Sequence, residues 1–373
     1  MNEVELITFF KDIHAHPELG FAEKRTTAKV LKALRAHGIR TLDTGLPTGT
    51  IAVVGGHRPG RTIGLRCDMD ALPIQEETGL DYASVNPGVM HACGHDAHTS
   101  IMLAAATLLK AEEDQLDGSV KIIFQPSEES ANGASRVMAT GLLDDVDEFY
   151  AVHCYPWFRS GTLGIREGAV MAAPDSFRIE VRGRGVHAAQ PFKGVDPIPA
   201  AATIALAAQG ILRRTVDPFS PAVLSVTHIA AGSTWNVLPD SALLEGTVRT
   251  LNPQDRERIR AELRQLSQSV AEAHGCTAAF HWGAGPAAVI NDAALCDAAR
   301  RLALEMGFRV ERQEDTMGGE DFSVYLEKRP GAFLRVGTGG GYPSHHAKYC
   351  VDPSALWPAA RFFARLAMER ARP

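Results

Sequence analysis

The chain lacks the features that would direct a protein to a membrane or to nucleic acid. No apolar run approaches the roughly 20 residues of a membrane-spanning helix, and the first five residues, MNEVE, are acidic where a secretory signal would be basic. The formal net charge is only -6 over 373 residues, without a basic stripe, so the electrostatic footprint of nucleic-acid binding is missing. We therefore expect a cytoplasmic protein that binds neither membranes nor nucleic acid.

Closely spaced cysteine pairs, internal repeats and low-complexity tracts are also missing. The absence of paired spacings argues against a disulfide framework and for reduced thiols. The chain is too long for a typical single core, and its 45% hydrophobic content supports well-buried cores, so two domains are expected. The six scattered cysteines are Cys67, Cys93, Cys154, Cys276, Cys296 and Cys350.

What the first part of the chain does contain is an alternation of short apolar runs and helical stretches. The runs lie at 51–54, 62–65, 120–124 and 149–152, and the helical stretches include 97–111 and 134–143. Such alternation predicts an α/β fold, with a mostly parallel sheet covered by helices on both faces. The glycines at 55, 56 and 60 between the first two runs predict a hairpin turn.

The pattern changes near residue 174. Apolar and charged residues alternate over 176–182, as in a half-exposed antiparallel strand. A helix at 197–212, strands near 222–229 and 243–250, a helix at 253–274 and a strand at 277–282 complete a β-α-β-β-α-β order, which is typical of an α+β ferredoxin-like domain. We predict a discontinuous catalytic domain, 1–173 and 285–373, interrupted by an inserted domain, 174–284.

Polar clusters follow the apolar runs of the predicted sheet. Asp68 and Asp70 follow one run, Glu128 and Glu129 the next, and His153 a third. Ligands of open parallel sheets bind beyond the carboxyl ends of the strands, so these clusters are expected to converge in one crevice. A solvated loop explains any single cluster about equally well, but it does not explain several clusters at equivalent strand ends.

The densest group of metal-binding side chains lies at 91–98, with the sequence HACGHDAH. In an extended segment Cys93 and His95 point the same way, and thiolate with imidazole suits Zn²⁺, Co²⁺ or Ni²⁺ better than Mg²⁺ or Ca²⁺. The alternative, in which Asp96 caps a helix and the histidines are only hydrogen-bonded, explains the cap but leaves the cysteine and three histidines unexplained.

Two further positions carry candidate site residues. In an extended chain Glu128 and Glu129 project to opposite sides, so one could bind metal while the other acts as general base on a water of lowered pKa. His345 and His346 follow the glycine-rich segment 337–341. That segment lacks the Gly-Lys-Ser/Thr helix start of a phosphate-binding loop, so a metal ligand on the loop is preferred.

With these motifs the chain resembles the aminoacylase and carboxypeptidase family of metal amidohydrolases, in the branch with hippurate hydrolases and plant indole-acetyl-amino-acid hydrolases. The resemblance covers nearly the whole chain. It rests on HPELGF at 16–21, RCDMDALP at 66–73, HACGHDAH at 91–98, FQPSEE at 124–129, HAAQP at 187–191, NVLPD at 236–240 and MGGEDF at 317–322.

The resemblance implies two divalent ions, of Zn, Mn, Co or Ni. Their ligands would be Cys93 as a bridge, His95, Glu129, His153 and a late histidine, placed at His345 rather than His346. Glu128 matches the general base, and Asp68 matches a carboxylate that orients the site.

The resemblance also implies that the inserted domain forms a homodimer. His187 would reach the partner's active site and stabilise the oxyanion, and Asn236 and Arg249 would bind the substrate or its carboxylate. The sequence departs from the family at Val186, usually glycine, and at Phe192, often histidine. These departures bear on the choice of acyl group.

The predicted function is metal-dependent hydrolysis of the amide bond of a small N-acyl amino acid, hippurate-like, N-acetyl or related, to a carboxylate and a free amino acid. Three alternatives stay open at this point. The same site could act as a dipeptidase or carboxypeptidase, Cys93 and a histidine could form a metal-free thiol hydrolase, or the chain could bind acyl amino acids without cleaving them.

Overall fold

The structure is a computed structural model that describes residues 1–130 and 132–373. The chain divides into two compact units. Unit 1 comprises Met1–Val170, Ile290–Glu314 and Asp321–Pro373, and unit 2 comprises Met171–Val289 and Asp315–Glu320. The domain boundaries at 173/174 and 284/285 stay a prediction.

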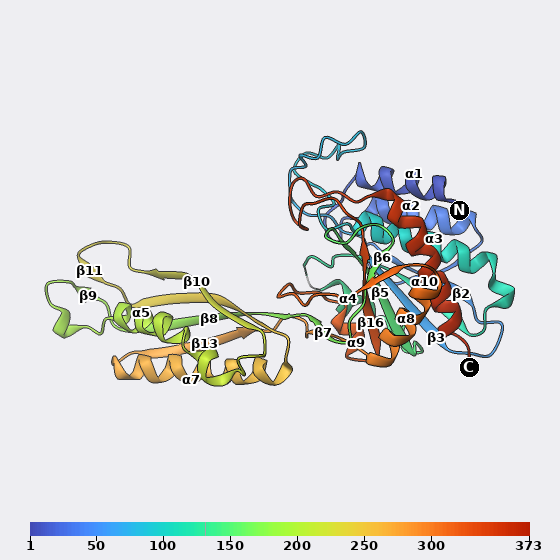
Figure 1. The fold of residues 1–373 in the computed structure, drawn as a ribbon. Helices are drawn as coiled ribbons and strands as arrows, with labels where there is room; N and C mark the ends of the chain where they lie inside the picture. Colours follow the sequence, from blue (N-terminus) through green and yellow to red (C-terminus); the bar gives the residue numbers. More distant parts are fainter. Residues whose placement is uncertain (131) are drawn as a thin grey trace. The chain divides into compact units, whose positions relative to one another are not determined.

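Unit 1 is built on an eight-stranded sheet (Figure 1). Its four central strands, β4, β3, β5 and β16, run parallel to one another, whereas β1, β2 and β6 pair antiparallel with their inner neighbours. The predicted α/β class is thus confirmed. The strands in sheet order are β1 (Arg40–Leu42), β2 (Thr50–Gly55), β4 (Ser119–Gln125), β3 (Thr62–Asp68), β5 (Glu148–Tyr155), β16 (Gly331–Gly337), β6 (Thr162–Gly164) and β15 (Arg309–Glu311).

Side chains alternate between the two faces of this sheet, as the two-residue period of a strand requires. On one face Ile63 and Leu65 join the main core with residues of α3 and α10. On the other face the Arg66 guanidinium donates to Gln125, whose carbonyl oxygen also accepts from Tyr325 of α9. The helices of the first face are α1 (Glu3–His14), α2 (Lys24–Ala36), α3 (His95–Ala111), α8 (Ala293–Glu305) and α10 (Leu356–Arg370), and those of the second are α4 (Gly133–Met138) and α9 (Ser323–Leu326).

Two local predictions in unit 1 were wrong. The glycines at 55–60 do not close a hairpin between β2 and β3, because β4 lies between these strands and pairs with both. The loop instead wraps over the start of β4, where Gly56 N–H donates to the Gly118 carbonyl. The helix predicted over 134–143 ends at Met138, because Gly141 takes a left-handed φ of 71° that a helix cannot continue.

Unit 2 contains a four-stranded antiparallel sheet in the order β10-β12-β8-β13. Along the chain its principal elements follow a β-α-β-β-α-β order: β8 (Ala173–Arg182), α5 (Pro197–Ala208), β10 (Ala222–Ala231), β12 (Ser241–Thr250), α7 (Pro253–Ala273) and β13 (Thr277–Gly283). Asp196 caps α5, which opens with Pro197. The helix predicted over 197–212 is interrupted near Gly210, and a separate short helix, α6 (Ile211–Thr215), follows.

Short elements complete both units. In unit 2 the strands β9 (Val186–His187) and β11 (Val237–Leu238) pair with each other, and η2 (Pro191–Lys193) follows β9. Unit 1 also contains η1 (Glu113–Gln115), η3 (Pro353–Ala355) and most of β7 (Gly168–Met171) and β14 (Val289–Asn291). Among residues 1–130 and 132–373, no helix is long and apolar enough to span a membrane.

Candidate metal centre

The carboxyl ends of the four parallel strands of unit 1 carry most of the predicted site. Asp68 ends β3, Glu128 and Glu129 follow β4, and His153 lies near the end of β5. His345 is in the loop after β16, and Cys93 and His95 lie at the start of α3. Since these strands are neighbours and parallel, their ends meet at one edge of the sheet. The structure therefore brings together the side chains that the sequence predicted to converge.

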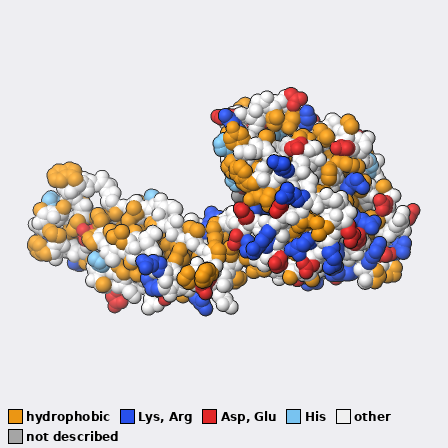
Figure 2. Space-filling view, in the orientation of Figure 1, with side chains coloured by type: hydrophobic (Ala, Val, Ile, Leu, Met, Phe, Trp, Pro, Cys, Tyr) orange, Lys and Arg blue, Asp and Glu red, His pale blue; other side chains and the backbone are white. Residues whose placement is uncertain are grey.

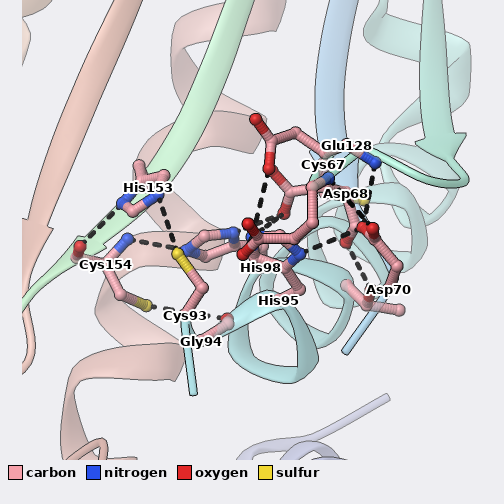
Figure 3. Close-up of polar contacts among 12 residues, drawn as sticks. Cys67, Asp68, Asp70, Cys93, Gly94, His95, His98, Glu128, His153 and Cys154 are labelled. Atoms are coloured by element: carbon pink, nitrogen blue, oxygen red, sulfur yellow. Dashed lines mark hydrogen bonds and ion pairs between the residues drawn. The ribbon is translucent and has the colours of Figure 1, made fainter. Parts of the chain in front are cut away.

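The metal-binding atoms form two groups that share Cys93. In one group Cys93, His95 and His153 offer donor atoms that all lie within 4.8 Å of one another, and in the other Cys93, Glu129 and His345 do the same. Cys93 Sγ lies 3.6 Å from His153 Nε2 (Figure 3), and Glu129 Oε1 lies 3.2 Å from His345 Nε2. One sulfur therefore belongs to both sets of donor atoms.

One buried donor atom of these groups has no hydrogen-bond partner among the residues that the structure describes. It is His95 Nε2, which lies 3.9 Å from Glu129 Oε1. A buried polar atom without a partner costs about 1–3 kcal/mol, and a shared cation removes that cost. One sulfur, three imidazoles and a carboxylate suit Zn²⁺, Co²⁺ or Ni²⁺, so the residues present fit a pair of divalent ions.

A hydrogen bond to the backbone sets which nitrogen of His153 is free to bind a metal ion. The Nδ1 of His153 donates to the Cys154 carbonyl oxygen at 2.8 Å, which leaves the lone pair on Nε2, the nitrogen that faces Cys93. Burial holds the pKa of His153 well below its usual value. The ring is therefore neutral, the form in which histidine binds metal.

His98 lies beside the donors but both of its nitrogens are occupied. Cys154 N–H donates to Nε2 at 2.7 Å, so Nδ1 carries the proton and donates to Asp68 at 2.6 Å (Figure 3). Burial would raise the pKa of Asp68, but His95, Arg66 and His98 hold it well below its usual value. Asp68 is thus a buried anion close to His98 and His95, and its predicted role as an orienting carboxylate is compatible with this position.

Asp70 is a site residue whose role the sequence did not reveal. Its two carboxylate oxygens accept from the backbone N–H groups of Glu128 and Glu129, each at 3.0 Å. Its Oδ1 also lies 3.2 Å from His95 Nδ1, so His95 keeps its lone pair on Nε2. Asp70 therefore holds His95 and the acidic turn together. The D-x-D spacing was visible in the sequence, but the partners are 25 and 58 residues away.

Two predictions about the local backbone of the site were wrong. Cys93 and His95 do not lie in an extended segment, because α3 begins at His95 after Gly94, whose φ is 88°. Asp96 is consequently inside the first turn rather than at the cap, and its Oδ2 lies 2.6 Å from His14 Nδ1. Likewise, Glu128 and Glu129 do not project to opposite sides, since carboxylate oxygens of both lie within 4.0 Å of His95 Nε2.

The loop after β16 separates the roles of its two histidines. Hydrogen bonds to Cys93 and Glu129 raise the pKa of His345 to about 10, and its Nε2 lies 3.2 Å from Glu129 Oε1. His346 instead stacks on Tyr342, with ring centroids 4.8 Å apart, and its Nδ1 accepts from Lys348 N–H. Of this pair, His345 is the histidine in the donor group.

The three predicted residues of unit 2 do not lie together. Val237 pairs with His187 across β9 and β11, and the carbonyl of neighbouring Asn236 accepts from Ala188 N–H. Figure 1 shows these short strands beyond one end of the four-stranded sheet. Arg249 pairs with Pro174 near the other end and donates to the Met317 carbonyl at 3.3 Å. At about 3.3 Å per residue, the length of β12 separates the two positions by roughly 25 Å.

Comparison with known proteins agrees with this geometry. The model of the peptidase family M20/M25/M40 matches residues 64–369. The N-acetylcysteine deacetylase of Bacillus subtilis strain 168 is 41% identical over 364 residues, covering 97% of this chain and 96% of that protein. The thermostable carboxypeptidase 1 of Saccharolobus solfataricus is 36% identical over 381 residues, covering 99% and 96%.

A solved structure extends the likeness to three dimensions. It is described as a dinuclear metal-binding peptidase of the M20 family from Bacillus subtilis, and it matches with a TM-score of 0.91 at 39% identity, covering 99% of this chain and 98% of the other. With a family model that spans most of the chain and relatives that cover nearly all of it, the protein belongs to peptidase family M20/M25/M40.

Proposed function

We propose that this protein is a metal-dependent hydrolase that cleaves the amide bond of a small N-acyl amino acid and releases a carboxylate and the free amino acid. One observation carries the proposal: metal-binding atoms from Cys93, His95, Glu129, His153 and His345 form two groups joined by one sulfur, with Glu128 4.0 Å from His95. A relative named as a deacetylase of N-acetylcysteine supports this substrate class.

Cys93, His95, Glu129, His153 and His345 would hold two divalent ions, with Cys93 common to both. When bound, such ions polarise the scissile carbonyl and lower the pKa of a water toward about 7. Zn²⁺, Co²⁺, Ni²⁺ and Mn²⁺ are the candidates. Asp68 and Asp70 keep His98, His95 and the acidic turn in place through the hydrogen bonds described above.

Glu128 is proposed as the general base and acid. Its carboxylate belongs to the same group of donor atoms as His95 and Glu129, and it is nearly buried. It would take a proton from the attacking water and return that proton to the leaving amine nitrogen, so that the product amine departs neutral. A positioned carboxylate of this kind contributes about 10²–10⁴-fold to turnover.

We also propose that unit 2 is a ferredoxin-like dimerisation domain. His187 and Asn236 lie roughly 25 Å from Arg249 within one chain, whereas an N-acyl amino acid is less than half that length. If all three contact one substrate, as the family resemblance implies, His187 and Asn236 must come from the partner chain. His187 would then stabilise the oxyanion and Arg249 the substrate carboxylate.

The surface of unit 2 supports a partner of the same kind. β10 is an edge strand with a mostly exposed second half, and unpaired strand edges invite pairing with another chain. The neighbouring helix α5 exposes Leu206 and Ile198. Figure 2 shows hydrophobic side chains over this unit, and those of Phe192 and Trp235 are 80% and 93% exposed.

A second candidate function is hydrolysis of a C-terminal peptide bond, because a close relative is named as a carboxypeptidase. Both reactions release an amino acid, and they differ in whether the group before the amide carries a free amine. A panel of N-acetyl, N-benzoyl and indole-acetyl amino acids beside the matching dipeptides separates them. Faster release from every dipeptide would replace the first proposal with the second.

The proposed function is tested by changing Glu128 and the metal separately. Glu128→Gln should lower turnover by roughly 10²–10⁴-fold while metal content stays unchanged. The control Glu112→Gln, at an exposed glutamate of unit 1, should leave turnover unchanged. Near-normal turnover of Glu128→Gln would remove Glu128 from the role.

Chelation distinguishes the proposal from its two remaining rivals. The metal-stripped protein should be inactive and should recover when Mn²⁺, Zn²⁺ or Co²⁺ is added back. A thiol hydrolase that uses Cys93 and His153, which lie 3.6 Å apart, would keep its activity without metal. A binding protein would release no amino acid under either condition.

A further inference from the structure

The segment 16–23 contains the sequence motif HPELGF at 16–21, and nothing so far accounts for it. It forms the connection between α1 and α2 and packs against the turn that carries Glu128. Gly20 is the closest point: a Cβ atom at Gly20 would lie 2.5 Å from Ser127 Oγ and 3.2 Å from Ser127 Cα. A side chain at position 20 would therefore force Ser127 to shift.

The turn itself has an unusual backbone. Ser127 has a φ of 56°, in the left-handed region that is disfavoured for residues with a side chain. This reversal is what directs both Glu128 and Glu129 toward His95 instead of letting them alternate. A turn in a disfavoured conformation needs contacts from its surroundings to keep it there.

Two buried carboxylates supply those contacts by accepting three successive backbone N–H groups. Glu23 Oε1 accepts from Ser127 N–H at 2.8 Å, and Asp70 accepts from Glu128 and Glu129. Consecutive N–H groups around a left-handed residue form a concave site for anions. Asp70 also contacts His95, whereas the carboxylate of Glu23 accepts from Ser127 N–H and from Thr48.

Glu23 is itself held rigidly. It is 0% exposed, it lies at the start of α2, and its second oxygen, Oε2, accepts from the Thr48 hydroxyl at 2.7 Å. Glu18, two residues before Gly20, accepts from the first N–H groups of α2 at Arg25 and Thr26. Glu18 of the motif therefore stabilises the start of α2, where Glu23 lies. Glu23 in turn holds the backbone just before Glu128.

We propose that Glu23 is a positioning residue for the general base, acting through Ser127 and assisted by the close contact of Gly20 with the same turn. This inference rests on the proposed function, since it assigns Glu23 a role only through Glu128. Glu23 does not contact the donor atoms. Its loss should loosen the backbone just before Glu128 and misplace that carboxylate, whereas Asp70 still accepts from Glu129 N–H and keeps that residue in position.

The first test compares Glu23→Ala with Glu23→Gln. Glutamine keeps an oxygen acceptor for Ser127 N–H and can reverse its contact with Thr48, because the Thr48 hydroxyl also accepts. Glu23→Ala should lower kcat by roughly 10- to 100-fold, with KM and metal content unchanged, and Glu23→Gln should recover most of that loss. Equal losses in the two variants, or no loss in Glu23→Ala, would overturn the inference.

The second test is a double-mutant cycle with Glu128→Gln. Because Glu23 acts only through Glu128, Glu23→Ala should cause no further loss of kcat in the Glu128→Gln background. A full, additive loss there would show that Glu23 acts by general destabilisation. Failure of the proposed function would look different, because Glu128→Gln alone would then retain turnover.

A control and a second variant guard against misfolding. Glu148→Gln changes another fully buried carboxylate, at the opposite end of β5 from His153, and should lower thermal stability without changing kcat. Gly20→Ala should lower kcat by pressing on Ser127, and Ser127→Gly in the same chain should restore part of it, since glycine accepts the positive φ. No restoration would contradict the role of the turn.

Discussion

The histidines of unit 1 show how neighbouring atoms decide what one residue type does. His98 uses both nitrogens in fixed hydrogen bonds, whereas His153 uses one and presents the other to Cys93. His14 lies between two carboxylates, with Nδ1 2.6 Å from Asp96 and Nε2 3.2 Å from Glu76. In the sequence His98 lies in the motif at 91–98, His153 follows an apolar run and His14 belongs to no quoted motif. Their different roles become visible only from their non-local partners.

A pH-dependent stability is expected from His14. Burial alone would lower its pKa, but Asp96 and Glu76 raise it to about 9. Since the folded pKa exceeds the unfolded value of about 6.5, the charged ring stabilises the fold fully below about pH 6.5, and this contribution is lost as the pH rises through 9. The shift corresponds to roughly 3 kcal/mol.

His14→Gln should therefore lower the free energy of unfolding much more at about pH 6 than at about pH 10. Urea unfolding at both values measures this, with the exposed His57→Gln as control. An equal effect of His14→Gln at the two values would contradict the paired, charged state of this ring.

Asp70 should matter for metal binding although it is not itself a proposed ligand. Asp70→Asn keeps one oxygen but replaces the other with an amide donor that faces backbone N–H groups, so His95 and the acidic turn lose a common anchor. Metal affinity should fall by roughly 10- to 100-fold, measured by competition with a chelator. Asp81→Asn, at a side chain 79% exposed, should have no effect, and an unchanged affinity of Asp70→Asn would refute the anchoring role.

At the scale of elements, strand ends were predictable and strand neighbours were not. Apolar runs and the polar residues after them located β3, β4 and β5 and the edge at which their side chains meet. The insertion of β4 between β2 and β3 depends on pairing between residues about 60 positions apart. The glycines between β2 and β3 suggest a hairpin whether or not another strand lies between them. The left-handed turn at Ser127 was also missed, because a serine carries no local signal for positive φ.

The C-terminal helix offers an element-scale prediction. Arg370 of α10 donates to both oxygens of buried Glu148 on β5, at 2.7 and 2.9 Å. Arg370→Ala removes this pair and leaves a buried carboxylate with fewer donors, so the free energy of unfolding should fall by roughly 3 kcal/mol. The matched control Arg365→Ala breaks a more exposed pair with Glu369 on the same helix and should cost at most about 0.5 kcal/mol. Similar losses in urea unfolding would contradict the anchoring of α10 by Glu148.

At the scale of the whole molecule, the proposed function requires a dimer, because His187 and Arg249 are far apart within one chain. A mixture of His187→Ala and Glu128→Gln chains tests it, because each variant alone should be nearly inactive. If His187 serves the partner's site, half of the dimers are mixed and one of their two sites is intact, so roughly a quarter of wild-type activity should return. Co-expression followed by activity measurement provides the result, and no recovery would place His187 in its own chain's site or outside the reaction.

The central claim is that Cys93 joins two sets of donors around two divalent ions. Anomalous diffraction from crystals of the protein loaded with Zn²⁺ or Co²⁺ tests it directly. Two anomalous peaks per chain are expected, one beside His95 and His153 and the other beside Glu129 and His345, with Cys93 Sγ between them. A single ion, or ions bound away from Cys93, would contradict it.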